Sequence, residues 1–332
     1  MIRYGILGFG LHAVRRLMPG FALAKHCTVT GLWRRDTAKA QAIVNQYSQF
    51  PLRAYDSPEA LCASTDVDAI FIASPDALHL QHSLLAIKHR KPVLCEKPMA
   101  MNVAECEQML AAADAAGMPL GIAHNFRFER SVNRLREIVG GGTIGKPILV
   151  RSEFHYLARG HSRTWLTDAN LACGGPVGDV GVHCIDSLRY ILQDEVSAVY
   201  ARALYDKDSG GVEAAATLIL EFQKGTLGEV SVSTRGEYRS PLWISGTDGT
   251  TGAEDALTVD HPIDLRTKPI NGEMISEQIS NEQAYADQVD AFALSLEKKL
   301  AFASPGIEGL RNQQVLDAAY RSLRGGKREE IR

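Results

Sequence analysis

Three side chains with acid–base or charge-stabilising chemistry stand at two points of the sequence. Lys97 lies in the run Glu96-Lys97-Pro98, and Asp179 and His183 lie four residues apart further along the chain. A lysine ammonium hydrogen-bonds a substrate oxygen and stabilises negative charge that develops on it. An imidazole takes a proton near neutral pH, and a carboxylate beside it orients it or holds substrate hydroxyls. We therefore predict Lys97, Asp179 and His183 as catalytic residues and as part of the substrate site.

Each of these residues also has a purely structural interpretation. Lys97 would form a surface ion pair with Glu96, although neighbours on a strand point to opposite faces. Asp179 would cap the N-terminus of a helix, and His183 would be a buried, hydrogen-bonded imidazole. On a helix the two residues share one face, and their early position predicts a dipole that keeps His183 neutral.

The elements that position Lys97 alternate between strand and helix. Short apolar runs predict strands over residues 3–7, 29–33, 67–73, 92–96 and 120–124. Helical spacing predicts helices over residues 11–23, 36–47, 76–89 and 103–116, and a further helix opened by Ser57 as N-cap and Pro58. This alternation predicts an α/β fold with a doubly wound parallel sheet, a Rossmann domain over residues 1–123.

The turn after the first strand fits a dinucleotide-binding fingerprint. The sequence Gly8-Phe9-Gly10-Leu11-His12-Ala13 follows a strand and opens a helix. The first glycine allows a tight turn, the second lets the backbone approach a pyrophosphate, and Ala13 allows close packing of the helix. The free N–H groups of the helix start favour an anion. The alternative is a glycine-rich turn that binds nothing.

The end of the second predicted strand indicates which dinucleotide binds. It reads Trp33-Arg34-Arg35-Asp36, and we align Arg34 with the place where an acid usually bonds the ribose hydroxyls of NAD. Two guanidinium groups suit a 2′-phosphate, which a carboxylate would repel. We therefore expect NADP(H) in preference to NAD(H), the alternative being that both arginines are solvated surface residues.

The second half of the chain, residues 124–332, has a different pattern. Strands are predicted over 147–155, 196–205, 213–223, 226–236 and 241–246, and closing helices over 281–299 and 305–323. Consecutive strands without intervening helices predict an α+β domain on a large, mostly antiparallel open sheet. One face is expected to be covered by helices, and Leu227, Val230 and Val232 to meet another subunit on the other. A homodimer or homotetramer is expected.

Composition narrows the classes of partner. The chain has 332 residues, 45% of them hydrophobic and 23% charged, and a formal net charge of −3. This balance drives no general attraction to nucleic acid or to an anionic membrane, and neither is expected as a partner. No leader pattern or long apolar span is present and the six cysteines are scattered, so a cytoplasmic location with reduced thiols is expected. His79 and His82 form an isolated His-x-x-His, and no metal site is expected.

Taken together, these motifs resemble the glucose-fructose oxidoreductase, inositol dehydrogenase and rhizopine-catabolism family, Gfo/Idh/MocA. The resemblance spans the fingerprint, Ser74-Pro75-Asp76-Ala77-Leu78-His79, Glu96-Lys97-Pro98, Asn125-Phe126-Arg127-Phe128 and the segment through His183. It implies an NAD(P)-dependent oxidoreductase with Lys97, Asp179 and His183 as its catalytic trio. Cofactor contacts are expected from residues 8–12 of the fingerprint and from residues 33–35 at the end of the second strand. The resemblance adds further cofactor contacts from Ser74, Pro75, His79, Glu96, Lys97 and Asn125.

The predicted reaction is reversible oxidation of a secondary alcohol of a sugar, polyol or related molecule to a ketone. His183 takes the hydroxyl proton, Lys97 bonds the same oxygen, and a bound nicotinamide accepts the hydride, so Lys97 and His183 are expected to meet across it. The substrate pocket is expected to include Arg127, Tyr156, Arg163 and Trp165. Two alternatives stay open: an NAD-dependent glycosidase of the same family, and a nucleotide-sensing regulator without turnover.

Overall fold

The computed structural model describes residues 1–158 and 164–332, which divide into two compact units. The first unit comprises Met1–Asn125 and Tyr285–Leu310, and the second comprises Phe126–Ala284 and Arg311–Arg332. Arg163 lies outside the described residues. None of the helices in the described part of the chain has the length and apolarity needed to cross a bilayer.

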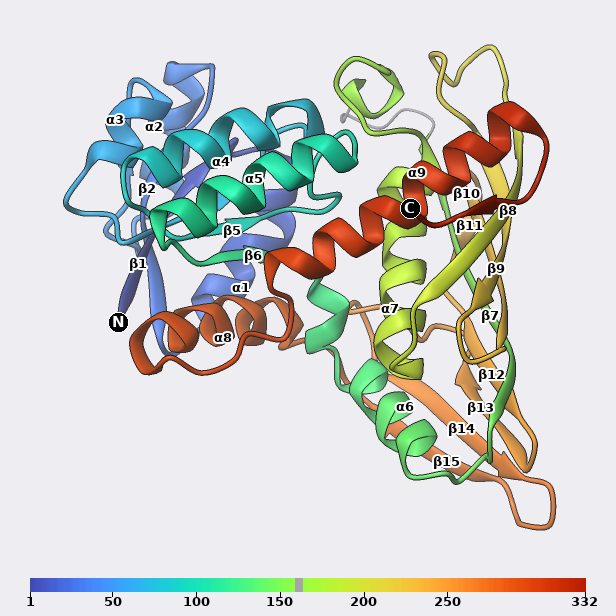
Figure 1. Cartoon of the computed structure of the whole chain (residues 1–332). Helices are drawn as coiled ribbons and strands as arrows, with labels where there is room; N and C mark the ends of the chain where they lie inside the picture. Colours follow the sequence, from blue (N-terminus) through green and yellow to red (C-terminus); the bar gives the residue numbers. More distant parts are fainter. Residues whose placement is uncertain (159–163) are drawn as a thin grey trace. The chain divides into compact units, whose positions relative to one another are not determined.

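The first unit contains a parallel six-stranded sheet in the order β3-β2-β1-β4-β5-β6 (Figure 1). Its strands are β1 (Ile2–Leu7), β2 (Cys27–Trp33), β3 (Arg53–Ala54), β4 (Ala69–Ile72), β5 (Val93–Cys95) and β6 (Leu120–Ile122). Its helices are α1 (Met18–Leu23), α2 (Thr37–Gln46), α3 (Pro58–Ala63), α4 (His79–Lys88) and α5 (Val103–Ala116). The strand order confirms the predicted Rossmann sheet.

Local sequence signals account for this alternation. All four residues of β4 are buried, as expected for a central parallel strand covered on both faces. Ser57 accepts a hydrogen bond from the Ala60 N–H at the start of α3, which confirms the predicted N-cap. Gly117 ends α5 with a left-handed φ of 61°. The carboxyl ends of the strands therefore meet at one edge, where ligands bind in sheets of this kind.

A segment from near the end of the chain packs with the first unit. The helix α8 (Ala284–Lys298) places Val289, Phe292 and Ala293 in the same buried cluster as Tyr4 and Phe21. The Tyr4 hydroxyl also donates to the Val289 carbonyl at 3.0 Å. The units are thus not the continuous ranges 1–123 and 124–332 that the sequence predicted, because the apolar face of this helix is buried in the Rossmann core.

The second unit contains a ten-stranded sheet, with the order β15-β14-β13-β12-β7-β10-β9-β8-β16 and β11 paired to β7. Its strands are β7 (Pro147–Leu157), β8 (Val196–Leu204), β9 (Ala215–Phe222), β10 (Leu227–Ser233), β11 (Arg235–Arg239), β12 (Leu242–Gly246), β13 (Gly249–Ala253), β14 (Ile263–Pro269), β15 (Ile275–Ile279) and β16 (Glu329–Glu330). All pairings are antiparallel except that of β10 with β7. This confirms the predicted open, mostly antiparallel sheet.

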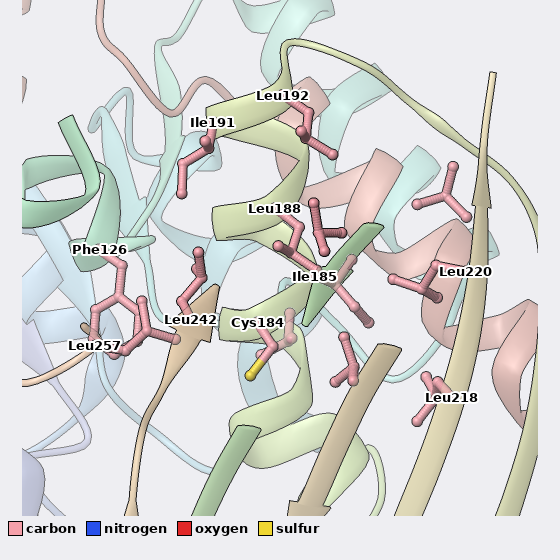
Figure 2. Close-up of a cluster of buried hydrophobic side chains, with 14 of the residues drawn as sticks. Phe126, Cys184, Ile185, Leu188, Ile191, Leu192, Leu218, Leu220, Leu242 and Leu257 are labelled. Atoms are coloured by element: carbon pink, nitrogen blue, oxygen red, sulfur yellow. The ribbon is translucent and has the colours of Figure 1, made fainter. Parts of the chain in front are cut away.

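Helices cover one face of this sheet and enclose the core of the second unit. They are α6 (Arg130–Gly140), α7 (Val182–Leu192) and the part of α9 (Gly306–Gly325) that follows Leu310. Figure 2 shows the α7 side chains Cys184, Ile185 and Leu188 among strand residues that include Leu218, Leu220 and Leu242. This packing fixes α7, the helix that follows Asp179 and carries His183.

The sheet residues expected to meet another subunit lie on opposite faces. Val230 and Val232 are 0% and 1% exposed and belong to the helix-covered core, whereas Leu227 is 48% exposed. Successive side chains of a strand alternate between faces, so only Leu227 of the three belongs to the open face. The expectation for Val230 and Val232 was therefore wrong.

Candidate active site

The glycine turn after β1 has the geometry that the fingerprint predicts. Gly8 has a φ of +88°, and a Cβ there would lie 2.4 Å from the Ser74 nitrogen, so no larger residue fits. At Gly10 a Cβ would meet only the Gly8 oxygen, at 3.9 Å. The backbone of the turn is thus packed on one side and open at Gly10, where a pyrophosphate would approach. Helical structure begins directly afterwards, at Leu11.

The strand β2 holds the base of this turn. Gly8 and Phe9 donate their backbone N–H groups to the Trp33 carbonyl at 3.1 and 3.3 Å, and the Phe9 side chain is buried. The backbone of the two predicted cofactor segments, 8–12 and 33–35, is therefore tied together in the first unit. Arg34 is half-buried and Arg35 is exposed.

Asp36, the acid nearest to these arginines, is engaged at a helix start. Its carboxylate accepts the Lys39 N–H at 3.0 Å and lies 3.1 Å from the Lys39 ammonium. These contacts with Lys39 lower the pKa of Asp36 below its ordinary value. The carboxylate thus caps α2, and the residues left at the end of β2 for a ribose substituent are the two arginines.

Glu96 is held at the end of β5 by a histidine of the glycine turn. The His12 Nε2 atom lies 2.8 Å from one carboxylate oxygen, and the other oxygen accepts the Lys97 N–H at 3.2 Å. Burial opposes ionisation of Glu96, but its interactions with His12 first, and then with Lys97 and His79, keep its pKa below the ordinary value. The carboxylate is therefore bound to His12 and to the backbone of Lys97, whose side chain is half-buried.

Asn125 offers a donor at the end of β6. Its side chain is 4% exposed, and its amide nitrogen has no hydrogen-bond partner among the described residues. Leaving a buried donor unpaired costs about 1–3 kcal/mol. A ligand with an acceptor oxygen would satisfy it, and the carboxamide group of a nicotinamide carries such an oxygen. The Gly10 opening and this amide are the features that fit a bound dinucleotide.

In the second unit, Asp179 and His183 lie on consecutive turns of one helical segment. A π-helical turn over Val177–Gly181 runs directly into α7, so the helical segment begins before Asp179. Turns of this type occur frequently at functional sites. The dipole effect is confined to the first turn, so it acts on Asp179 and not on His183, contrary to the expectation.

The contacts of both residues come from β7 and from the start of the second unit. The Tyr156 hydroxyl donates to Asp179 Oδ2 at 2.6 Å. The His183 ring stacks on Phe126, with ring centroids 4.4 Å apart, and lies 6.2 Å from the Phe154 ring. Both Asp179 and His183 are more than nine-tenths buried. Tyr156, predicted as a substrate residue, is therefore in direct contact with the predicted catalytic carboxylate.

The residue that anchors this helical segment had no signal in the sequence. Glu213, 2% exposed, accepts the Val177 N–H at 2.9 Å and the Tyr320 hydroxyl at 3.1 Å. A Cβ at Gly175 would lie 2.1 Å from the Glu213 carbonyl oxygen. Glu213 thus stabilises the helix start electrostatically. A glycine is required at position 175 because any side chain there would collide with the backbone of Glu213. Since Glu213 lies 36 residues away in sequence, only the fold brings the two together.

The remaining predicted substrate residues have different surroundings. Arg127 is 6% exposed, and its guanidinium binds both oxygens of Asp186, at 2.7 to 3.1 Å. The same guanidinium lies 5.1 Å from the centre of the Tyr190 ring. Trp165 is half-buried in a short 3₁₀ helix, Thr164–Thr167. The structure thus places Arg127 in a buried ion pair with the polar side of α7.

Ser74, Pro75 and His79 follow β4, at the same edge of the sheet as the glycine turn. His79 is 1% exposed, and both of its ring nitrogens contact backbone carbonyls. No cluster of three or more metal-ligating side chains occurs among the described residues.

Comparisons with known proteins agree with this arrangement. The profile of an oxidoreductase family with an NAD-binding Rossmann fold matches residues 2–124, and that of the GFO/IDH/MocA C-terminal domain matches residues 132–251. A D-xylose 1-dehydrogenase (NADP(+)) of Haloferax volcanii is 28% identical over 99% of both chains. The bovine trans-1,2-dihydrobenzene-1,2-diol dehydrogenase is 30% identical over 75% of this chain and 72% of its own. The aldose-aldose oxidoreductase of Caulobacter crescentus, solved with glycerol, superimposes with a TM-score of 0.92 at 26% identity over 99% of both chains.

Proposed function

Because the chain belongs to the GFO/IDH/MocA oxidoreductase family, we propose that it transfers a hydride between a nicotinamide cofactor and a secondary alcohol or ketone of a sugar, polyol or related small molecule. The observation that carries the proposal is the glycine turn, closed against Ser74 at Gly8 and open at Gly10. The named activities of the xylose, dihydrodiol and aldose relatives support the substrate class.

The end of β2 supports NADP(H) as the preferred cofactor. Asp36 is occupied as the N-cap of α2, so its carboxylate does not serve as the ribose acceptor that NAD-selective strands present. Arg34 and Arg35 remain as cations suited to a 2′-phosphate. Two relatives, from Haloferax volcanii and Haloarcula marismortui, are named as NADP(+) enzymes, which agrees with this preference.

For the chemistry, we assign proton transfer to His183 and charge stabilisation to Lys97. His183 takes the hydroxyl proton of the substrate, while the Lys97 ammonium donates a hydrogen bond to the same oxygen. Stacking on Phe126 fixes the plane of the imidazole and leaves its nitrogens at the ring edge. Asp179, held by the Tyr156 hydroxyl, accepts hydrogen bonds from the substrate hydroxyls or orients the base. The cofactor supplies the hydride acceptor.

The open face of the large sheet supports association into a homodimer or homotetramer. Leu227 and Leu149 are paired neighbours on β10 and β7, and Ile219 lies on the adjacent strand β9. All three side chains are about half exposed. An apolar group of this kind on a sheet face without covering helices is typical of subunit contacts.

The test is a screen of sugars, polyols and their keto forms, followed through the absorbance of the reduced nicotinamide with NADP and with NAD. We expect turnover with NADP and a lower kcat/KM with NAD. The Lys97→Ala variant should lower kcat by about 10²–10⁴, the range for a positioned electrostatic or acid–base group. Lys88→Ala, which removes an exposed lysine at the end of α4, is the matched control.

Three outcomes would contradict parts of the proposal. Turnover of Lys97→Ala at the wild-type rate would remove the lysine from the mechanism. Release of nitrophenol from nitrophenyl glycosides without added cofactor, with no oxidation of free sugars, would favour the glycosidase alternative. A clear preference for NAD would overturn the cofactor assignment alone.

A further inference from the structure

Two buried histidines on α4 have no part in the chemistry above. His79 and His82 stand one turn apart, and they are 1% and 3% exposed. The Nδ1 atom of His79 lies 2.9 Å from the Pro98 carbonyl oxygen, and its Nε2 atom lies 2.9 Å from the Ser74 carbonyl oxygen. Both partners are carbonyl oxygens, which accept hydrogen bonds and never donate them.

This geometry determines the charge of His79. A neutral imidazole carries a proton on one nitrogen only, so one of the two contacts would set a lone pair against a carbonyl oxygen. An imidazolium donates from both nitrogens and satisfies both carbonyls. We propose that His79 is a constitutive imidazolium that ties the turn after β4 to the turn after β5, and so acts as a positioning residue for the glycine turn and Lys97.

The groups that face His79 support a positive charge. They are the Asp76 carboxylate on the preceding turn, Cys95 on β5 and Glu96 beyond it, whereas His82 on α4 itself faces the ring as a group of like charge and opposes it. Burial by itself lowers the pKa of His79, but Cys95, Asp76 and the Pro98 carbonyl outweigh it and raise the pKa to about 10. The positive ring in turn contributes to the low pKa of Glu96.

His82 is the neutral member of the pair. Its Nδ1 atom lies 3.0 Å from the Ser74 hydroxyl, and its ring and that of Trp33 form a T-shaped pair with centroids 5.8 Å apart. Burial and the charge of His79 lower the pKa of His82 to about 4. The two rings therefore hold Ser74 in two ways, His79 by its carbonyl oxygen and His82 by its hydroxyl. This accounts for the His-x-x-His motif without a metal.

The Ser74 and Pro98 carbonyls belong to two turns at the carboxyl edge of the parallel sheet, one next to the glycine turn and one next to Lys97. Ser74 is the residue against which Gly8 packs, with 2.4 Å between a Gly8 Cβ and the Ser74 nitrogen. Pro98 directly follows Lys97. A single buried cation thus fixes the support of the glycine turn and the backbone that carries the lysine. The part that concerns Lys97 rests on the function proposed above.

The charge of His79 is tested directly by NMR on the full-length chain labelled with ¹⁵N-histidine, with and without NADP. The His79 signals are assigned by their loss in His79→Gln, and free histidine serves as the titrating reference. We expect protons on both His79 nitrogens and no titration between about pH 6 and about pH 9, whereas an ordinary imidazole changes state there. A single-proton tautomer of His79 in that range would overturn the proposal. The readout needs no activity, so it stands apart from the proposed function.

The positioning role is tested by kinetics of His79→Gln, with His89→Gln at the end of the same helix as control. We expect kcat and kcat/KM to fall together by about 10²-fold, the scale for a catalytic group displaced by about 1 Å. Nucleotide affinity, followed through tryptophan fluorescence, should weaken as well. Wild-type kinetics in a folded His79→Gln protein would overturn the positioning role. If that variant does not fold, the wild-type NMR signals of His79, assigned by elimination from the other nine single-histidine variants, decide the charge.

Discussion

Replacing Arg127 with methionine should destabilise the second unit and leave the kinetics of the folded enzyme nearly unchanged. The guanidinium is 5% exposed and pairs with an Asp186 side chain that is 1% exposed. Methionine keeps the volume of the arginine stem and removes the charge. The variant would therefore leave the Asp186 carboxylate buried without its main partner.

The magnitude follows from what remains around that carboxylate. Removing one partner of a buried ion pair costs about 3–5 kcal/mol. Asp186 keeps the Asn312 amide at 2.8 Å and Arg189 at 3.8 Å, so we expect the lower end, about 3 kcal/mol. For a unit of this size each kcal/mol lowers the Tm by about 2–4 °C, which gives a decrease of about 6–12 °C.

The assay is thermal and urea unfolding of Arg127→Met beside Arg130→Met, an exposed arginine three residues away. The control should stay within about 0.5 kcal/mol of wild type. Adding Asp186→Asn to Arg127→Met should recover part of the loss, because the double variant buries no unpaired carboxylate. The reasoning is refuted if Arg127→Met unfolds like Arg130→Met. A raised substrate KM with unchanged stability would instead make Arg127 a substrate residue, as the sequence predicted.

Two further predictions concern the buried imidazole of His82 and the hydrogen bond between Tyr156 and Asp179. Because the pKa of His82 is lowered to about 4, its contribution to stability is present above about pH 6.5 and is lost as the pH falls towards 4; this amounts to about 3 kcal/mol. Urea midpoints across that range should therefore fall more steeply for wild type and for His89→Gln than for His82→Gln, and equal slopes would contradict the assignment. Tyr156→Phe removes the hydroxyl that donates to the buried Asp179, a hydrogen bond to a charged group worth about 1.5–3 kcal/mol, so the free energy of unfolding should fall by about that amount and kcat roughly tenfold to hundredfold. Steady-state kinetics equal to wild type would show that Asp179 does not depend on Tyr156.

The Rossmann half was predictable because its signals are local. Each central strand is a short run of buried apolar residues, such as Ala69–Ile72, and helices start at capping residues such as Ser57. The second half was harder. The strands β13 to β15, between residues 249 and 279, had no predicted counterpart, because they include polar and glycine-rich residues such as Gly249–Ala253. Their stability depends on neighbours in the sheet that the local sequence does not reveal.

The second limit on prediction from the sequence was the identity of the core in which each apolar face is buried. The pattern of an amphipathic helix predicts that one of its faces is buried, but not in which hydrophobic core. Residues Tyr285–Leu310 were therefore assigned to the second domain, whereas they belong to the first unit. The alternation along β10 did contain usable information. Side chains on one face of a strand are an even number of residues apart, and Leu227 lies an odd number of residues from Val230 and from Val232. A strict two-residue period would therefore have placed Leu227 on the opposite face from the two valines. Which of the two faces the helices cover remained a property of the fold.

In the candidate site too, the sequence reveals the types of the residues but not the groups that they contact. The sequence identified polar residues at the right elements, but their roles follow from how each one's hydrogen-bonding capacity is used. Both nitrogens of His79 and the guanidinium of Arg127 are bound by groups of the protein itself, which gives them positioning and structural roles. The buried amide nitrogen of Asn125 has no partner among the described residues, at a cost of about 1–3 kcal/mol. An acceptor oxygen on a bound ligand recovers that cost, so of these three residues Asn125 is the one with a hydrogen-bond donor left to offer a cofactor.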